Sequence, residues 1–196
     1  ERWFLGNTYH MAIGQGDVQL TPLQAAMMAS AAVTGKRCQP LIALLATNSQ
    51  KLITNNCEDI GVSEANRNLI LEGMVGTCSS GGTAFPFFPW NQSIEGLTFN
   101  ETIHQANGVN GYPAVACKTG TAQHGGKQTK PHAWIAVTGP VVKEEGRGKK
   151  EEGMYGLDLE SKKRIVLAVM LEEAGEGSYE AGPVAKKILE KWFKGL

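Results

Sequence analysis

An apolar run near the end of the chain limits the possible fold more than any other feature of the sequence. After Arg164 it reads Ile165-Val166-Leu167-Ala168-Val169-Met170-Leu171. A strand that is apolar at successive positions is apolar on both faces, which is typical of a sheet covered on both sides. The sequence therefore predicts a layered fold in which other elements lie against both faces of a sheet.

The remaining elements predict the class of this fold. Further strands are expected at 117–123 and at Ala133–Val137. Thr21-Pro22-Leu23-Gln24 starts a helix, with Thr as N-cap, Pro at the first helical position and Gln at N3. Ser63 can cap a second helix and Pro183 opens a last one. The order of helix, helix, three strands and helix predicts an α+β fold, with an antiparallel sheet covered by helices on both faces.

Each predicted helix has an apolar face that we expect to lie in the core. The first helix is expected to end at Gly35. The expected core residues are Leu23, Ala26, Met27, Ser30 and Ala31 in the first helix, Ile70, Leu71, Met74, Val75 and Cys78 in the second, and Val184, Ile188, Leu189, Trp192 and Phe193 in the last.

Two segments are predicted to be loops. Thr83–Ala114 is rich in Pro, Gly and Asn and contains a group of aromatic residues between 85 and 90. These aromatics either line a substrate groove or attach the loop to the core, and the second interpretation is favoured. The charged segment Lys143–Gly153 is expected to be a solvated hairpin loop without chemistry.

Composition excludes several classes of protein. The 196 residues are 42% hydrophobic, and 19 Lys and Arg balance 19 Asp and Glu, which predicts one globular domain without a basic surface for nucleic acid. The spacing of Cys38, Cys57, Cys78 and Cys117 matches no zinc site, and we expect buried free thiols. The histidines are scattered, so no metal site is expected. No cofactor is expected either.

The run Cys117-Lys118-Thr119-Gly120-Thr121-Ala122-Gln123 is the candidate binding strand. Alternation sends Thr119 and Thr121 to one side and Lys118 to the other, while Gly120 leaves the backbone open to a ligand. On an edge strand, free backbone groups can pair with an extended peptide whose charged end these side chains orient. Cys117 falls on the side of the threonines, where we expect its thiol to be reachable, unless this face turns inward.

Four motifs together carry a resemblance. Ile13-Gly14-Gln15-Gly16, Thr21-Pro22-Leu23-Gln24, Gly82-Thr83-Ala84 and the Lys-Thr-Gly strand resemble the second half of the transpeptidase domain of class B penicillin-binding proteins. That family shares a penicillin-recognising fold and the motifs Ser-x-x-Lys, Ser-x-Asn and Lys-Thr-Gly with serine β-lactamases. Only the third motif is present. We therefore expect residues 1–196 to be the C-terminal portion of a single transpeptidase domain whose nucleophile lies outside this sequence.

The resemblance implies a peptidoglycan D,D-transpeptidase that acts in cell-wall biogenesis and cell shape. A serine supplied from elsewhere would attack a D-Ala-D-Ala stem peptide, and the acyl group would pass to an amine on a neighbouring strand. Lys118 would supply positive potential, Thr119 and Thr121 would bind the carboxylate of the substrate or β-lactam beside Gly120, and the Thr121 N–H would be one of two oxyanion-hole donors. Cys117 stands where the family commonly has a small residue such as Gly.

The resemblance also implies partners and a location. The partners are peptidoglycan stem peptides, β-lactam antibiotics and the missing N-terminal part of the domain, for which a separate chain is one option. The expected location is the extracytoplasmic face of the bacterial inner membrane, with an anchor outside this sequence. A β-lactam sensor, a β-lactamase-like hydrolase and an inactive scaffold fragment remain alternatives, although the Gly-Gln-Gly and Thr-Pro-Leu-Gln segments favour the transpeptidase.

Overall fold

The computed structural model describes residues 2–16, 18–40, 56–91, 112–126, 128–143, 155–158 and 161–195. At their centre is a three-stranded antiparallel sheet with the order β3-β4-β7. Its strands are β3 (Ala116–Ala122), β4 (His132–Gly139) and β7 (Ile165–Leu171). The predicted antiparallel sheet is therefore confirmed, and β3 is an edge strand among the described residues.

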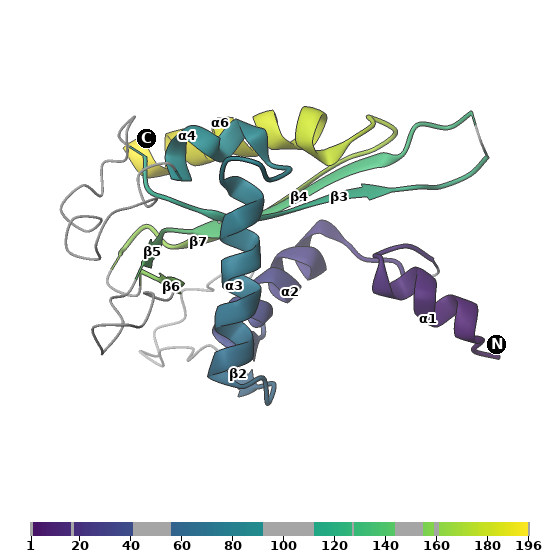
Figure 1. The fold of residues 1–196 in the computed structure, drawn as a ribbon, viewed down its shortest axis with the longest axis horizontal. Coiled ribbons are helices and arrows are strands. Elements are labelled where there is room, and N and C mark those ends of the chain that lie inside the picture. The colour runs from purple at the N-terminus through teal and green to yellow at the C-terminus, as the bar shows by residue number, and fades with distance from the viewer. Residues whose placement is uncertain are drawn as a thin grey trace, which may run out of the picture.

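Helices cover both faces of this sheet (Figure 1). One face carries α6 (Gly182–Lys194), preceded by the π-helical turn η2 (Gly177–Ala181), together with η1 (Phe85–Phe87) and α4 (Phe88–Asn91). The other face carries α2 (Pro22–Thr34) and α3 (Glu64–Cys78). The strand β7 contacts both α2 and α6, which explains why its sequence is apolar on both sides and confirms the covered sheet.

The apolar core has one part on each face of the sheet. Neighbouring residues of β3 enter different parts: Ala116 packs with α2 and α3, whereas Cys117 packs with α6. The alternation predicted for this strand is therefore present. The part under α6 includes Phe87, Trp90, Val115, Ile135, Val137 and Leu189, and the part under α2 and α3 includes Val33, Leu71, Met74, Val75 and Val141.

The predicted starts of α2 and α3 are confirmed, but the residues predicted to be buried in these helices are confirmed only in part. Thr21 and Gln24 form the predicted capping box of α2, and the Ser63 hydroxyl caps α3. In α2, however, Leu23 is 48% exposed and Val33 is the buried residue. In α3, Ile70 is also exposed, while the other four predicted residues are buried.

The predicted face of α6 is wrong for three residues. Val184, Ile188 and Trp192 are exposed, whereas Ala185 and Leu189 are fully buried. The small Ala185 side chain brings the helix close to the sheet, so a neighbouring stripe of the same helix faces the core. Trp192 instead donates its indole N–H to the Lys163 carbonyl at the surface.

Several short elements were not predicted. They include α1 (Leu5–Ala12), the hairpin of β1 (Lys36–Cys38) with β2 (Cys57–Asp59), and the pair β5 (Val141–Lys143) with β6 (Tyr155–Leu157). The turn η2 was not predicted either, and η1 and α4 lie in a segment that was predicted to be a loop. Strands of three residues are too short to show a period-2 pattern. The helix α1 buries none of its residues, so it has no core-facing stripe to detect. The loop expected at 143–153 lies outside the described residues after Lys143.

The cysteines correct the expectation of free thiols, because all four form disulfides. Cys38 pairs with Cys57 across the β1–β2 hairpin, with Cα atoms 4.0 Å apart. Cys78 at the end of α3 pairs with Cys117 on β3, with Cα atoms 5.6 Å apart. Sequence spacing gave no sign of either pair, since only the fold brings their Cα atoms within bonding range.

The aromatic residues after Thr83 fix this segment to the core, as favoured from the sequence. Phe87 and Trp90 are buried, and the Trp90 ring stacks on Tyr112 with centroids 4.7 Å apart. Phe85 is 41% exposed and contacts Tyr179 of η2 with centroids 5.0 Å apart. The rest of the predicted loop, residues 92–111, lies outside the described residues.

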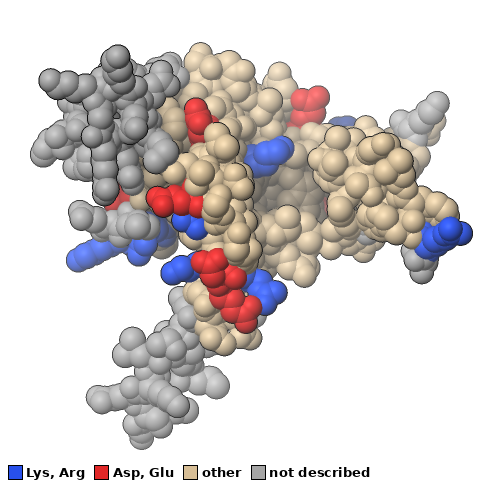
Figure 2. Space-filling model, turned by 60° about the horizontal axis from the view of Figure 1, so that its bottom comes forward, with Lys and Arg blue, Asp and Glu red and all other residues tan. Residues whose placement is uncertain are grey.

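The surface has no dominant charge on the face that Figure 2 shows, where acidic and basic side chains lie side by side. On the β1–β2 hairpin, Arg37 and Glu58 form an exposed ion pair. No helix within the described ranges is long and apolar enough to cross a bilayer.

Candidate functional site

The four predicted site residues lie together on the edge strand β3. On its inner side, β3 pairs with β4, where Lys118 is opposite Ala136 and Thr121 is opposite Ala133. No strand among the described residues pairs with the other side. Lys118 and Thr121 are exposed, and Thr119 and Gly120 are half-buried. The structure therefore presents the whole Lys-Thr-Gly-Thr run along one open strand edge.

The Lys118 side chain bends back over this edge. Its Nζ donates a hydrogen bond to the Thr119 carbonyl at 2.5 Å. No carboxylate in the described part of the chain forms an ion pair with Lys118. The charge of this ammonium group is therefore available to an anionic ligand that approaches the strand edge.

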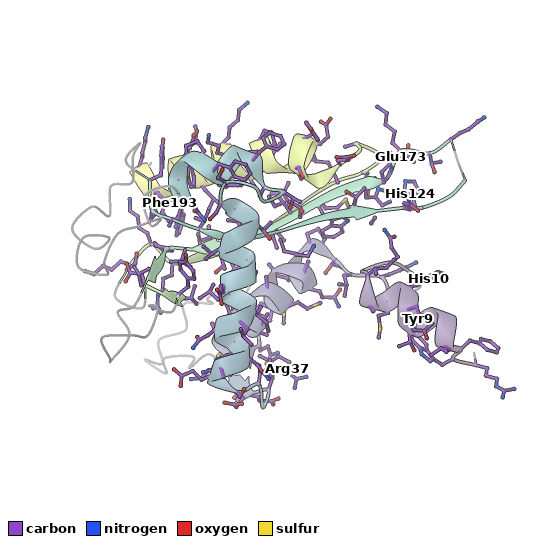
Figure 3. All side chains as sticks on the ribbon, in the orientation of Figure 1. Tyr9, His10, Arg37, His124, Glu173 and Phe193 are labelled. Carbon is purple, nitrogen blue, oxygen red and sulfur yellow. A yellow bond between two sulfur atoms is a disulfide. The ribbon has the colours of Figure 1, made fainter. Side chains whose placement is uncertain are left out.

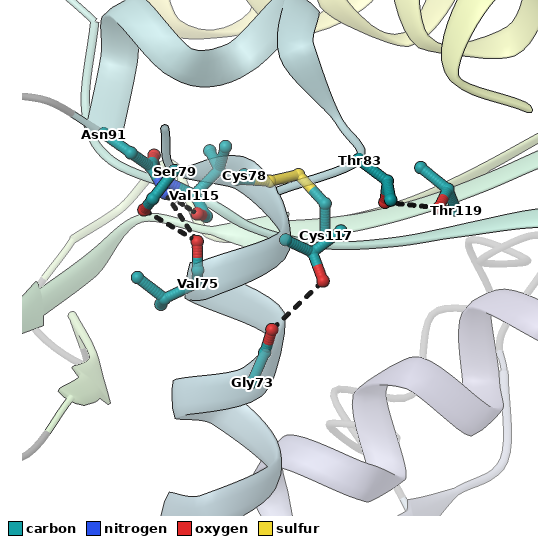
Figure 4. The surroundings of a disulfide bond; sticks show 10 residues. Gly73, Val75, Cys78, Ser79, Thr83, Asn91, Val115, Cys117 and Thr119 are labelled. Carbon is teal, nitrogen blue, oxygen red and sulfur yellow. Dashed lines mark hydrogen bonds between the residues drawn. A yellow bond between two sulfur atoms is a disulfide. The ribbon is translucent and has the colours of Figure 1, made fainter. Parts of the chain in front are cut away.

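The Thr119 hydroxyl is oriented by a second hydroxyl. Thr83 Oγ1 and Thr119 Oγ1 are 2.8 Å apart and share a hydrogen bond (Figure 4). Thr83 follows the turn that ends α3, and this turn is held by the bond from Ala84 N to the Thr77 carbonyl. The sequence placed Gly82-Thr83-Ala84 in a family motif but assigned no role to Thr83.

A disulfide fixes the strand immediately before Lys118. Figure 4 shows Cys78 at the end of α3 bonded to Cys117 on β3. Both cysteines are fully buried, so the expectation that the Cys117 thiol is reachable from the groove is wrong. Cys117 does lie on the predicted side of the strand, but that side turns inward here and is covered by the core under α6.

A buried amide holds the strand two residues earlier. Asn91 Nδ2 donates to the Val115 carbonyl at 2.7 Å, and the Val115 N–H donates to Asn91 Oδ1 at 2.9 Å. Asn91 is fully buried, where an unpaired amide would be costly. The start of the strand is thus held by α4 and by the end of α3.

Gly120 faces a close neighbour on each side. A Cβ at Gly120 would lie 3.2 Å from the Cβ of Trp134, its partner on β4. On the η2 side, Gly177 packs against the carbonyl oxygens of Gly120 and Trp134 so closely that a Cβ there would collide with both. These close contacts leave no room for a side chain at Gly177 and little at Gly120. That Gly120 leaves the backbone open to a ligand stays a prediction.

The Gln15 side chain forms hydrogen bonds with the backbone at the end of β3. Its Nε2 donates to the Thr121 carbonyl at 2.8 Å, and its Oε1 accepts from the Gln123 N–H at 3.3 Å. The sequence placed Gln15 in the Gly-Gln-Gly motif without a role. The signal that could have found it is the pair of flanking glycines, which indicates a constrained backbone.

Two histidines pack together at the end of the β3–β4 hairpin where the two strands are connected. The rings of His124 and His132 stack with centroids 3.9 Å apart, and the Glu173 N–H donates to His132 Nδ1 at 3.0 Å. Figure 3 shows His124 beside Glu173 at this end of the sheet. No three His, Cys, Asp or Glu side chains come together as a metal site in the described ranges.

This arrangement offers the kinds of groups that would recognise an extended peptide with a terminal carboxylate. The open edge of β3 offers backbone groups for pairing, Lys118 offers a positive charge, and Thr119 and Thr121 offer hydroxyls. The sequence contains no serine with a lysine three residues later to act as an activated nucleophile.

Comparisons with known proteins identify the family and the fold. The family model described as penicillin binding protein transpeptidase domain matches residues 1–191. The fold is similar to a chain in the complex between penicillin-binding protein PBP2 and MreC from Helicobacter pylori, with a TM-score of 0.59, 24% identity and 99% of this chain covered. It is also similar to PBPA from Mycobacterium tuberculosis, with a TM-score of 0.51, 20% identity and 92% covered.

The matched structures are longer than this chain. The match covers 28% of the Helicobacter pylori chain and 34% of the Mycobacterium tuberculosis chain. No protein with curated function matches the sequence.

Proposed function

Because this chain belongs to the penicillin-binding protein transpeptidase domain family, we propose that it forms the Lys-Thr-Gly side of a peptidoglycan D,D-transpeptidase site. The observation that carries the proposal is the geometry of β3. Its open edge presents Lys118, Thr119 and Thr121 together, and no partner strand in the described part of the chain covers it.

The proposed reaction has two covalent steps. A serine from a segment outside this sequence attacks the carbonyl carbon of the peptide bond between the two D-Ala residues of a stem peptide. The C–N bond breaks, and the terminal D-Ala leaves as an amine that has gained the proton lost by the serine hydroxyl. An amine of a neighbouring stem peptide then attacks the acyl-enzyme. The new peptide bond forms, and the serine regains its hydroxyl.

In this reaction the chain supplies binding and electrostatic stabilisation. Lys118 provides positive potential at the strand edge, and the hydroxyls of Thr119 and Thr121 bind the substrate carboxylate. The Thr121 N–H acts as one oxyanion-hole donor. Loss of such a donor typically costs about 2.7–4 kcal/mol of transition-state stabilisation. A β-lactam would occupy the same groups through its own carboxylate.

The proposed location is the extracytoplasmic face of the bacterial inner membrane. The two disulfides, Cys38–Cys57 and Cys78–Cys117, support this, since disulfides persist in oxidising compartments and are rare in the cytosol. Besides the stem peptides and β-lactams, we propose one protein partner. It is the part of the domain that contains the nucleophile, in the same chain or as a second chain.

The test is the intact mass of the complete protein after incubation with a penicillin. We expect one covalent adduct, located by peptide mapping on a serine outside residues 1–196. An adduct that disappears rapidly with release of penicilloic acid would instead identify a hydrolase. A stable adduct without transfer to an added amine acceptor would favour a sensor, and the absence of any adduct would favour an inactive scaffold.

A further inference from the structure

The Gln15 carboxamide occupies the open edge of β3 as a neighbouring strand would. It donates to the Thr121 carbonyl at 2.8 Å and accepts from the Gln123 N–H at 3.3 Å. One C=O and one N–H two residues apart are the groups that a paired antiparallel strand would bond. The two groups held by Gln15 directly follow the open N–H of Thr121 along the edge.

The loop that carries Gln15 has a constrained backbone. Gly14 and Gly16 have φ values of 74° and 101°, which side-chain-bearing residues rarely adopt. The Gln15 N–H donates to the His10 carbonyl at 2.9 Å at the end of α1. Since α1 buries none of its residues, the contact between Gln15 and β3 is not a by-product of core packing around α1.

These bonds also show which way the backbone of Thr121 points. In an antiparallel pair, residues alternate between directing both backbone groups to the partner strand and directing both away from it. Because the Thr121 carbonyl bonds Gln15 outside the β3–β4 ladder, the Thr121 N–H also faces the open edge. The preceding outward carbonyl, that of Thr119, is bonded by Lys118.

We propose that Gln15 is a positioning residue for the transfer reaction, an inference that rests on the proposed function. Its carboxamide holds the backbone of Thr121, so that the Thr121 N–H is oriented as an oxyanion donor before substrate arrives. Gln15 also bonds the edge groups that follow the Thr121 N–H, so a stem peptide cannot pair with β3 beyond that N–H. Preorganised donors are effective because they need no reorientation during the reaction, and small misplacements are costly.

Three variants of the complete protein test this role. Gln15→Met keeps the approximate side-chain length and loses both bonds. Gln15→Glu keeps an acceptor for the Gln123 N–H and loses the donor to the Thr121 carbonyl. Gln24→Glu is the matched control, since the side-chain oxygen of the exposed Gln24 accepts bonds from Thr21 in the α2 cap and a glutamate keeps that oxygen. For each variant, the penicillin binding constant, the acylation rate constant and the melting temperature are measured.

At neutral pH, we expect both Gln15 variants to acylate about 10-fold more slowly, with penicillin binding changed less than about 2-fold. Gln24→Glu should acylate as the wild type does. As the pH falls from about 7 towards the ordinary glutamic acid pKa of about 4.3, the carboxyl introduced by Gln15→Glu gains a proton and can donate to the Thr121 carbonyl again. The Gln15→Glu rate, relative to wild type at the same pH, should therefore rise, and the Gln15→Met rate should stay low.

Two results would overturn the positioning role. One is acylation of both Gln15 variants at the wild-type rate. The other is a rate that falls only with the melting temperature and does not recover in Gln15→Glu at low pH, which would make Gln15 a structural tether. Failure of the wild-type protein to form any adduct is a different result, because it refutes the proposed function itself and this inference with it.

Discussion

At the scale of single residues, we expect Lys118 to matter for the acylation rate and to contribute little to the stability of the fold. Its side chain is exposed and bonds only the neighbouring Thr119 carbonyl in the described structure, so it adds little to the core. In the complete domain, Lys118→Ala should slow penicillin acylation by about 100-fold or more, because a charge beside the developing oxyanion is lost. The melting temperature should change by less than about 2 °C.

Labelled-penicillin kinetics and thermal melting of the same samples check this expectation. Lys162→Ala, which removes an exposed lysine from the turn before β7, is the control and should change neither quantity. A Lys118→Ala protein that melts much earlier, and whose folded fraction acylates normally, would show that Lys118 is structural.

Thr83 gives a second residue-scale prediction. Thr83→Val keeps the side-chain shape but removes the hydroxyl that orients Thr119. We expect acylation to slow by about 5-fold and the free energy of unfolding to fall by about 1 kcal/mol, the usual worth of one hydrogen bond. Thr77→Val is the control, because it removes a hydroxyl that bonds the Gly73 carbonyl within α3. Equal acylation rates in the two variants would remove Thr83 from the site.

At the scale of elements, the contact between η2 and the sheet depends on Gly177. A Cβ there would collide with the carbonyl oxygens of Gly120 and Trp134, and backbone atoms cannot move aside as a flexible side chain can. Gly177→Ala should therefore lower the free energy of unfolding by about 3 kcal/mol in urea denaturation. Gly73→Ala, in α3 with open space for the new Cβ, should raise it by about 0.5–1 kcal/mol. Similar effects of both changes would mean that η2 does not pack tightly on β3.

The two disulfides are predicted to differ in what they contribute. Replacing Cys78 and Cys117 by alanine should lower the free energy of unfolding by about 4 kcal/mol, because the pair spans 39 residues and both sulfurs are buried. Replacing Cys38 and Cys57 should cost less, since this pair spans 19 residues of a surface hairpin. Loop length alone accounts for about 0.6 kcal/mol of the difference. The free energies of unfolding of the two variants are measured by urea denaturation. If they differ only by the amount that loop length explains, the buried pair adds nothing through packing.

At the scale of the whole molecule, the proposed substrate-binding edge stands in a sequence that contains no activated serine. We expect the isolated 196-residue chain to form no covalent adduct with labelled penicillin, because no serine in it has a lysine three residues later. Addition of the segment that carries the nucleophile should produce the labelled band. A stable band on the isolated chain would contradict a nucleophile that lies outside it.

The sequence by itself determined the features that depend on nearby residues. The capping box of Thr21 and Gln24, the strand around Lys118 and the doubly apolar strand β7 were all predicted, and the structure contains each of them. Caps and alternation depend on residues a few positions apart, so a short window contains their cause. The α+β class followed from the order of such elements.

Only the tertiary structure decided which distant groups meet. Cys117 finds Cys78 across 39 residues, and Gln15 reaches the Thr121 carbonyl across 106. The buried stripe of α6 likewise depended on how closely Ala185 lets the helix approach the sheet. No short window contains these contacts, because they are set by the packing of the whole chain. The sequence could therefore identify the residues of the candidate site, and the fold alone revealed the side chains that hold them in place.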